Sequence, residues 1–372
     1  MKRITIILKP TSECNFRCSY CYHADTNYER GRMSLELFEE IIQKTVSYYN
    51  DIVLIFHGGE PLLMGYDFFV KALEIIKKYT TKYVNIKLGI QTNGFLLDEK
   101  FCSLFQANGI LPAISFDGPG ELNSLRDKTD EVTKRIVELK SKGYSLNLLG
   151  VITKRNLFKL NECHDFAKVN HCHYKMNPVF ESGGAKEDNN YLISSKEYID
   201  ALKEFLPIWM SDETAISDFE PISSLVYMAL TKIGRGCTVC GCLTKWISIH
   251  HDGTLYPCGR SYPEEYCLGR IQDIDNLSLA FNHPNFKKLI KGAIQRRDNC
   301  YHTCSYYSMC QGGCNNDSLL KGDLAQPSGF WCDVYKEMIP FIQEYCQNNL
   351  DKIANIHVVE LLKRCDYGKH ND

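Results

Sequence analysis

The sequence lacks any apolar run long enough to cross a membrane, which takes about twenty residues in a helix. It also lacks a charge imbalance, since 43 Lys and Arg residues stand against 45 Asp and Glu residues. Without concentrated positive charge, we expect neither a nucleic-acid partner nor an anionic membrane partner. The apolar stretch near the N-terminus is shorter than the core of a secretion signal and is predicted to form a first strand. We therefore predict a cytoplasmic protein.

Cysteine, in contrast, is abundant, with 18 among 372 residues. Because the cytosol keeps thiols reduced, this number indicates metal binding and not a disulfide framework. The first group is the CxxxCxxC run Cys14, Cys18 and Cys21. Three thiolates can hold three corners of a 4Fe-4S cube and leave one iron open for a ligand. Short cysteine spacings also form zinc sites, so the spacing alone leaves that alternative open.

Three short polar motifs follow apolar runs downstream of this cysteine group. Gly58-Gly59-Glu60-Pro61 comes after the run at 52–56, as a loop leaving a buried strand would. Gln91-Thr92-Asn93-Gly94 and Ser115-Phe116-Asp117-Gly118-Pro119 each end a later apolar stretch. The glycines of the first motif would let the backbone approach a ligand closely.

Together, the cysteine run and the three motifs resemble those of the radical S-adenosylmethionine (AdoMet) enzymes. In that family the amino and carboxylate groups of AdoMet chelate the open iron. An electron from the cluster then cleaves AdoMet to a 5′-deoxyadenosyl radical, which abstracts a hydrogen atom from the substrate. The resemblance implies a 4Fe-4S cluster on Cys14, Cys18 and Cys21, AdoMet as cofactor, and a reductant such as flavodoxin or ferredoxin.

The resemblance also implies residues that bind AdoMet. Tyr20 is expected at the adenine, Gln91 and Asn93 on the ribose side, and Ser115 with Arg126 at the carboxylate. Ser115 and Asn93 could instead be turn or capping residues, and Arg126 could be a solvated charge at a helix start. The predicted set is Tyr20, Gly58, Gly59, Glu60, Pro61, Gln91, Asn93, Ser115 and Arg126.

His57, just before the first motif, is the candidate for a catalytic side chain that faces the substrate. Its alternative is a histidine oriented by neighbouring backbone. The histidine pairs His171/His173 and His250/His251 have no carboxylate or cysteine spacing nearby that would complete a metal site. We therefore predict no metal role for either pair.

Strand and helix signals alternate through the first half of the chain. Repeated βα units imply a parallel sheet with right-handed crossovers, and six units favour an unclosed barrel. The resemblance implies the partial (β/α)6 barrel, with the motifs at its C-terminal face. The predicted strands are 3–8, 52–56, 86–91, 111–115, 145–152 and 174–178, and the predicted helices lie near 34–49, 67–80, 97–107, 129–142 and 157–168.

A second cysteine-rich region follows the predicted helices Glu197–Trp209 and Ile222–Lys232. It resembles a SPASM domain, the auxiliary-cluster extension of peptide-modifying radical enzymes. A zinc-ribbon-like fold is the alternative for this region. We predict a barrel with bridging helices at 1–230, a SPASM domain at 231–345, and a C-terminal helix and tail at 346–372.

The SPASM resemblance implies two auxiliary 4Fe-4S clusters. Cys258 and Cys314 would join two of Cys237, Cys240 and Cys242 at the first, and which two is left open. The second would use Cys300, Cys304, Cys310 and Cys332. Isolated cysteines are predicted to be small buried hydrophobes: Cys102, Cys163, Cys172, Cys346 and Cys365. Cys267 is assigned to neither class.

Two enzyme functions fit this architecture. The layout resembles anaerobic sulfatase-maturating enzymes, which oxidise a cysteine or serine of a sulfatase to formylglycine. Those enzymes carry an aspartate directly after the Tyr-Pro-Cys of the SPASM region, placed to accept a proton, whereas this chain has Gly259. We therefore expect a maturase that oxidises a ribosomally made precursor peptide, forming a thioether or carbon-carbon crosslink.

Two further considerations bear on this expectation. Many peptide maturases carry an N-terminal leader-recognition domain, and Cys14 lies too near the start of the chain to leave room for one. The substrate would then be held by the SPASM region or by a separate protein. A non-catalytic iron-sulfur or zinc protein would explain the cysteines but not the three motifs after successive strands.

Overall fold

The computed structural model describes residues 2–25, 30–188, 190–216, 218–237, 239, 242–260 and 262–364. It is built on a nine-stranded sheet in the order β7-β6-β5-β4-β3-β2-β1-β8-β9. The first six strands run parallel to one another in chain order. They are β1 (Arg3–Leu8), β2 (Asp51–Phe56), β3 (Asn85–Thr92), β4 (Leu111–Ser115), β5 (Asn147–Ile152) and β6 (His173–Pro178), and the predicted strands coincide with them.

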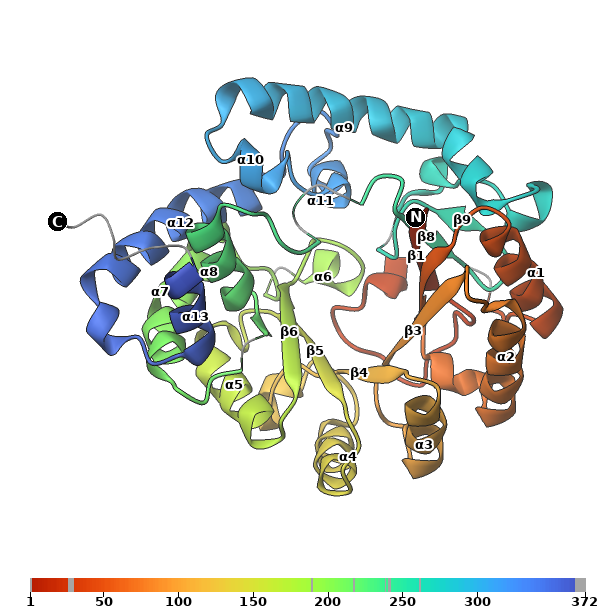
Figure 1. Ribbon diagram of the computed structural model, residues 1–372, viewed down its shortest axis with the longest axis horizontal. Helices are drawn as coiled ribbons and strands as arrows, with labels where there is room; N and C mark the ends of the chain where they lie inside the picture. The colour runs from red at the N-terminus through yellow and green to blue at the C-terminus, as the bar shows by residue number, and fades with distance from the viewer. Residues whose placement is uncertain are drawn as a thin grey trace.

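Helices cover the outer face of this sheet, as right-handed crossovers require (Figure 1). Apolar side chains on their inner faces pack on the strands, as where Phe38 and Phe69 meet Phe56. The sheet ends at β7 and β9, which do not pair with each other. The predicted unclosed barrel is therefore confirmed. The helices are α1 (Leu35–Val46), α2 (Tyr66–Tyr79), α3 (Glu99–Ala107), α4 (Thr129–Ser141) and α5 (Leu160–Val169).

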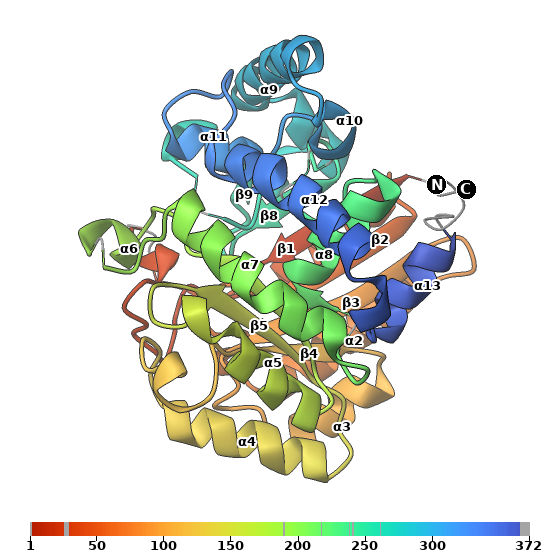
Figure 2. The same cartoon turned by 90° about the vertical axis from the view of Figure 1, so that its left-hand side faces the viewer.

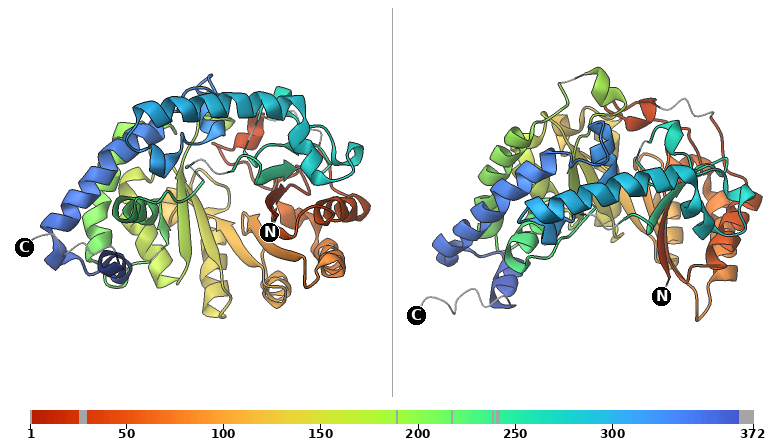
Figure 3. Two further views of the ribbon diagram at one scale, coloured as in Figure 1. Left: turned by 45° about the horizontal axis from the view of Figure 1, so that its top comes forward. Right: turned by 90° about the horizontal axis from the view of Figure 1, so that it is seen from above.

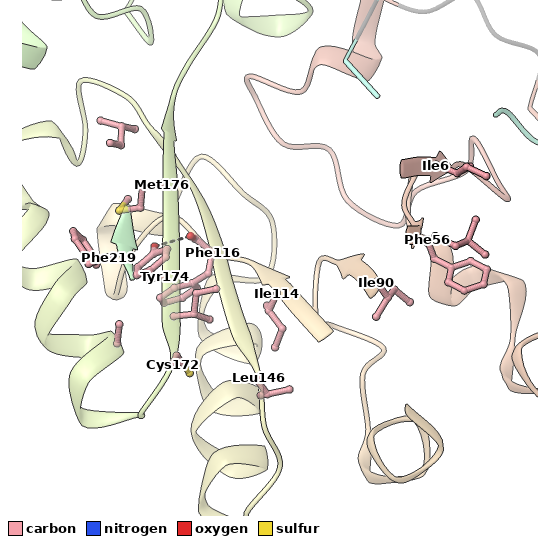
Figure 4. Packing of buried hydrophobic residues seen from close by; sticks show 14 of the residues in the cluster. Ile6, Phe56, Ile90, Ile114, Phe116, Leu146, Cys172, Tyr174, Met176 and Phe219 are labelled. Atoms are coloured by element: carbon pink, nitrogen blue, oxygen red, sulfur yellow. Dashed lines mark hydrogen bonds between the residues drawn. The ribbon is translucent and has the colours of Figure 1, made fainter. Parts of the chain in front are cut away.

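Aromatic side chains fill the core on the β4 to β7 side of the sheet (Figure 4). The fully buried Tyr174 packs edge-on against Phe219, with ring centroids 5.7 Å apart. Its hydroxyl donates a 2.6 Å hydrogen bond to the carbonyl of Phe116. A buried phenol needs such a partner, and the bond ties β6 to the residue that follows β4. The bond thus fixes the start of the loop after β4 to the neighbouring part of the sheet.

The sheet continues beyond the predicted domain boundary near residue 230. After α7 (Ser195–Ser211), β7 (Phe219–Glu220) and α8 (Ile222–Thr231), the chain returns as β8 (Trp246–Ile249) and β9 (Leu255–Tyr256). Strand β8 pairs parallel with β1, and β9 pairs antiparallel with β8. The cysteine-rich region therefore begins within the sheet, and the predicted division into domains stays a prediction.

The remaining helices lie above the sheet and along one side of it. α9 crosses over the top of the molecule in Figures 1 and 3, and α12 runs beside α7 and α8 in Figure 2. None of the described helices is both long enough and apolar enough to span a bilayer. These helices are α6 (Gly184–Glu187), α9 (Pro284–Thr303), α10 (Tyr307–Cys310), α11 (Asn315–Leu320), α12 (Phe330–Asn348) and α13 (Ile356–Arg364).

Candidate functional site

The loops after β1 and β2 pack backbone against backbone at the C-terminal edge of the sheet. The amide of Gly59 donates to the carbonyl of Thr11 at 3.1 Å, and that of Glu60 to Glu13 at 2.8 Å. A Cβ added at Gly59 would lie 2.1 Å from the Glu13 carbonyl oxygen, so only glycine allows this approach. The glycine motif therefore fixes the position of the cysteine loop through these backbone contacts.

The thiols of Cys14, Cys18 and Cys21 are all free, and those of Cys18 and Cys21 lie within electrostatic reach of Cys14. Burial raises the pKa of Cys14 to about 11, and the negative charges of Cys18 and Cys21 add to that rise. Because only thiolates bind metal, ionising all three so close together requires a cationic centre that they share. The three thiols therefore fit a 4Fe-4S cluster. No three His, Cys, Asp or Glu side chains among the described residues converge closely enough to hold a single metal ion.

Tyr20, Asp117 and Arg126 form a buried network beside this loop. Tyr20 donates its hydroxyl hydrogen bond to Asp117, and the Arg126 Nε lies 3.0 Å from the other carboxylate oxygen. The guanidinium also lies over the Tyr20 ring, 5.4 Å from its centroid. Only 11% of the Arg126 side chain is exposed, so its alternative interpretation as a solvated charge is wrong. Asp117 belongs to the third motif, but the sequence assigned it no role.

Glu60 joins the loop after β2 to the loop after β3. Its fully buried carboxylate accepts hydrogen bonds from the Thr92 hydroxyl at 2.8 Å, the Asn93 amide at 2.7 Å and the Leu62 amide at 2.9 Å. Burial raises the pKa of Glu60 to about 7, although these donors oppose the rise. Pro61 begins the short 3-10 helix Pro61–Met64 that follows. The motif thus connects the loops that follow β2 and β3 by hydrogen bonds.

The predicted ribose-side and carboxylate-side residues lie at the ends of β3 and β4. The Gln91 amide donates to the Ser115 hydroxyl at 3.4 Å. The Asn93 side chain donates to Asn15 in the cysteine loop at 2.7 Å and accepts from the Phe95 amide at 3.0 Å. Asn93 therefore does cap a turn, as its alternative interpretation expected, while also contacting the cysteine loop. All predicted AdoMet residues lie around one edge of the sheet.

The structure gathers the C-terminal thiols in two places. Cys237, Cys258 and Cys314 lie within electrostatic reach of one another, and Cys258, Cys314 and Cys242 all lie within electrostatic reach of Tyr262. Cys240 lies outside the described residues. The second set is Cys300, Cys304, Cys310 and Cys332, whose charges influence one another in the same way. The assignment of these thiols to two auxiliary clusters stays a prediction.

Lys9 and three histidines lie between the two cysteine-bearing regions, and the sequence analysis did not place them together. Burial lowers the pKa of Lys9 to about 8, while the thiols of Cys258 and Cys21 oppose that change. Burial, reinforced by the charge of Lys9, lowers the pKa of His57 to about 4 and that of His250 to about 2. The same two effects lower the pKa of His23. A cation and neutral imidazoles therefore line the site at neutral pH.

His57 is oriented by neighbouring backbone, as its alternative interpretation expected. Its Nδ1 accepts a 2.8 Å hydrogen bond from the Gly58 amide. The side chain remains partly exposed at the edge of the sheet. His250, in contrast, is 5% exposed and stacks on Tyr256, with ring centroids 4.9 Å apart.

Gly259 lies in the same region, beside Cys258. Its carbonyl accepts a 3.3 Å hydrogen bond from the Tyr22 hydroxyl. A Cβ added at Gly259 would lie 2.8 Å from the Ile7 Cγ2 atom, and Ile7 is itself a buried residue of β1. An aspartate at this position, which sulfatase-maturating enzymes were expected to carry, would therefore require the Ile7 side chain to move.

Arg260 follows Gly259, and its side chain interacts with other residues of the protein. Its guanidinium pairs with Asp317 and packs over the Phe180 ring, 4.7 Å from the centroid. A small cavity of about 40 Å³ lies beside it, between the end of β6, Cys237 and Trp331. Sequence reasoning missed this ion pair because its partners stand far apart in the chain.

The isolated cysteines fall where expected. Cys102, Cys163, Cys172 and Cys346 are at most 3% exposed, which confirms their prediction as buried hydrophobes. Cys365 lies outside the described residues. Cys267 is half-buried, with its thiol 3.9 Å from the Gly269 carbonyl. His173 lies near Asp218 at 3.6 Å and joins no thiol group.

A model of the radical SAM superfamily matches residues 8–166, from the last residue of β1 into α5. The chain carries a radical SAM domain. It is 27% identical to the cysteine-type anaerobic sulfatase-maturating enzyme of Clostridium perfringens, over 95% of this chain and 99% of that protein. A radical SAM domain uses a 4Fe-4S cluster and AdoMet, so these are cofactors of this enzyme.

Solved structures agree with this assignment. Native anSMEcpe with bound AdoMet and Cp18Cys peptide has a TM-score of 0.80 and 25% identity, covering 98% of this chain and 99% of that one. Streptococcus suis SuiB bound to the precursor peptide SuiA has a TM-score of 0.65 at 18% identity, covering 88% and 76%. The likeness to SuiB shows the fold alone.

Proposed function

We propose that this radical SAM enzyme is a peptide maturase that oxidises a ribosomally made peptide and forms a thioether or carbon-carbon crosslink. The observation that carries the proposal is Gly259. The residue has no side chain to accept a proton, and a Cβ added there would lie 2.8 Å from the Ile7 Cγ2 atom, so that Ile7 would have to move to admit a carboxylate. An enzyme that makes formylglycine by the expected route would need a proton acceptor at this position, whereas another type of peptide oxidation does not require one there.

In this proposal Cys14, Cys18 and Cys21 hold the radical SAM cluster. Bound AdoMet supplies the 5′-deoxyadenosyl radical that abstracts a hydrogen atom from the peptide. Tyr20, Gln91, Asn93, Ser115, Arg126 and the motif 58–61 form the walls of the AdoMet site. Their mutual hydrogen bonds support this role because a pre-organised shell orients a cofactor without further rearrangement.

We further propose two auxiliary clusters in a SPASM domain. Cys258 and Cys314 would hold the first with two of Cys237, Cys240 and Cys242. Removal of a hydrogen atom leaves one more electron to be removed during crosslinking, and a cluster near the substrate could accept it. The second cluster would be held by Cys300, Cys304, Cys310 and Cys332, with a reductant such as flavodoxin or ferredoxin as the external electron partner.

A second candidate is the maturation of a sulfatase by oxidation of a cysteine or serine to formylglycine. The observation that favours it is the similarity to a sulfatase-maturating enzyme along almost the whole of both chains. The sulfatase candidate fits the relatives at least as well as the peptide maturase does. It would require a proton acceptor other than residue 259.

Mass spectrometry distinguishes the two candidates. The peptide encoded beside this gene is co-expressed anaerobically with the wild-type enzyme, and a sulfatase is co-expressed in a parallel culture. If the enzyme is a crosslinking maturase, we expect the peptide to lose two hydrogens for each crosslink. Fragmentation of the modified peptide then locates the new bond. Formylglycine in the sulfatase, with the peptide unchanged, would instead establish the second candidate.

The matched control is the Cys14→Ala, Cys18→Ala, Cys21→Ala variant. We expect this variant to lose AdoMet cleavage but to keep the iron of the auxiliary sites, because those thiols lie in other regions of the chain. Iron analysis and the yield of 5′-deoxyadenosine measure the two properties. Unchanged AdoMet cleavage in this variant would contradict the assignment of the three cysteines.

A further inference from the structure

Arg296 is a fully buried cation in the second half of α9. Its guanidinium donates hydrogen bonds to the carbonyl of Gly312 at 2.7 Å, to the carbonyl of Leu324 and to the side chain of Asn315. A longer contact of 3.5 Å reaches the Gly313 carbonyl. A guanidinium presents five donors in a rigid fork, so one arginine can hold several acceptors in a fixed arrangement. Arg296 therefore joins α9 to the turn between α10 and α11.

This turn has an unusual backbone. Gln311, Gly312 and Gly313 have φ values of 52°, 87° and 75°, so three successive residues lie in the left-handed region. Glycine adopts this region readily, but glutamine does so at a cost, and such conformations persist where the surrounding structure imposes them. The turn separates Cys310 from Cys314, two thiols that we assign to different auxiliary clusters. Its shape therefore sets the relative position of these two thiols.

The same arginine lies close to the second set of thiols. Cys300 follows Arg296 by one turn of α9, so the two side chains lie on the same face of that helix. Burial and the neighbouring thiols raise the pKa of Cys300, and the positive charge of Arg296 opposes that rise. The Gly312 amide donates a hydrogen bond to the Cys310 sulfur, which opposes the effect of burial on the pKa of that thiol. Arg296 thus holds a residue whose amide contacts a predicted cluster ligand.

An amide hydrogen bond to a ligand sulfur stabilises the negative charge that an iron-sulfur cluster gains on reduction. Such hydrogen bonds are among the features that set the reduction potential of a cluster. Residues outside the ligand shell contribute by fixing the orientation of the groups that contact the metal site. Because Arg296 binds the Gly312 carbonyl, it restrains the residue that supplies this amide.

We propose that Arg296 is a positioning residue for the second auxiliary cluster, where it holds Gly312 in the orientation that directs its amide to the Cys310 sulfur. The inference rests on the auxiliary clusters of the proposed function, and it adds a residue that sets the reduction potential of one of them. That cluster, when bound, supplies one-electron chemistry. Arg296 acts on it through Gly312.

The test is a redox titration followed by electron paramagnetic resonance. It uses the full-length Cys14→Ala, Cys18→Ala, Cys21→Ala variant as parent, in which the auxiliary clusters supply the iron-sulfur signals. The signal that disappears when Cys332→Ala is added identifies the second cluster. We expect Arg296→Lys and Arg296→Met to lower the midpoint potential of this signal by about 59 mV, which is a tenfold decrease in the equilibrium constant of a one-electron reduction.

Arg296→Lys separates position from charge, because lysine keeps the cation but its single ammonium cannot hold the same acceptors. The matched control is Arg297→Lys at the next position of α9, where the guanidinium reaches the Gln311 side chain at 3.4 Å. We expect the control to keep the midpoint potential of the parent, and an equal shift in it overturns the inference. Melting temperature and iron content show that each variant is folded and loaded. If Arg296→Met does not fold, Arg296→Lys carries the test.

Three further results would overturn the inference. The first is an unchanged potential in the Arg296 variants, even where the melting temperature falls, because the arginine would then only stabilise the fold. The second is a lower potential in Arg296→Met with the parent value in Arg296→Lys, because charge alone would then explain the effect. The third is a parent variant that holds no auxiliary iron, which removes that part of the proposed function as well.

Discussion

Gly259 illustrates how the size of one residue limits the chemistry of a site. A side chain at this position would press against the buried Ile7 of β1, and the Gly259 carbonyl accepts a hydrogen bond from the Tyr22 hydroxyl. In sequence, the same glycine is only a departure from an expected pattern. In three dimensions it belongs to the packing of the sheet, because β9 lies next to β8 and β8 next to β1. An aspartate at this position would therefore displace the Ile7 side chain of β1.

Substitution of Gly259→Ala should lower the free energy of unfolding by about 1–3 kcal/mol, the usual effect of overpacking a core. The added Cβ would meet Ile7 at 2.8 Å, so combining it with Ile7→Ala should recover part of that cost relative to the sum of the single changes. Denaturant unfolding of all four proteins measures this coupling. Gly89→Ala in β3 is the control, because its Cβ would meet only Ile55 at 3.6 Å. Purely additive effects would contradict the contact.

The free energy of unfolding should fall as the pH drops below about 6.5, which is the ordinary pKa of a histidine side chain. Burial lowers the pKa of His250 to about 2, so the unfolded chain binds a proton below pH 6.5 that the folded chain does not. One such group costs about 1.4 kcal/mol for each pH unit. His250→Phe keeps a ring against Tyr256 and should reduce this slope in urea unfolding at pH 7.5 and 5.5. The exposed His302→Gln serves as control, and equal slopes in both variants would refute the prediction.

At the scale of elements, the site depends on loops braced by their neighbours. Glu60 connects the loops after β2 and β3, and Gly59 lies against the cysteine loop after β1. Helix starts are held by similar local bonds. In α7 the Ser194 hydroxyl accepts from the Glu197 amide at 3.1 Å, while the Glu197 carboxylate accepts from the Ser194 amide at 2.8 Å. This reciprocal pair fixes where α7 begins.

Loss of this cap should be measurable in the whole protein. We expect Ser194→Ala to lower the free energy of unfolding by about 1 kcal/mol, since it leaves helix amides without a partner. The control is Ser211→Ala at the other end of α7, where the hydroxyl only donates to the Ile208 carbonyl. That change should stay within about 0.5 kcal/mol. Equal effects of the two substitutions in denaturant unfolding would argue against the capping role.

At the scale of the molecule, the barrel and the cysteine-rich region share one sheet. β8 covers the open edge of β1, and α12 packs against α7 and α8. Cys21 of the barrel and Cys258 of the cysteine-rich region thereby both lie within electrostatic reach of Lys9. The same connection implies that the barrel depends on the rest of the chain for its stability.

A fragment ending at residue 230 should therefore not fold stably. It would expose the β1 edge from Thr5 to Leu8 that β8 normally covers, and unpaired edges promote aggregation. It would also uncover apolar residues of α8 that α12 buries. Size-exclusion chromatography and thermal melting, with the full chain as control, test this expectation. A monomeric fragment with a cooperative transition would show that residues 1–230 are an independent domain.

Much of the barrel could be predicted from the sequence. Apolar runs and helical periodicity located β1 to β6 and α1 to α5, because each pattern records which face of a local element is buried. β8 and β9 were not predicted. They are short, and their pairing with β1 joins residues more than two hundred positions apart in the sequence, as Thr5 and Trp246 show. Local patterns carry no information on such contacts.

The candidate site divides in the same way. The cysteine spacings and the three motifs determined the radical SAM assignment by themselves, since metal and cofactor chemistry requires those residue types at short range. Only the tertiary structure decided that Arg126 is buried against Asp117, that Ile7 packs closely against Gly259, and that Lys9 stands beside neutral histidines. These properties arise where distant segments pack together. Burial and charge depend on that packing and not on the order of residues along the chain.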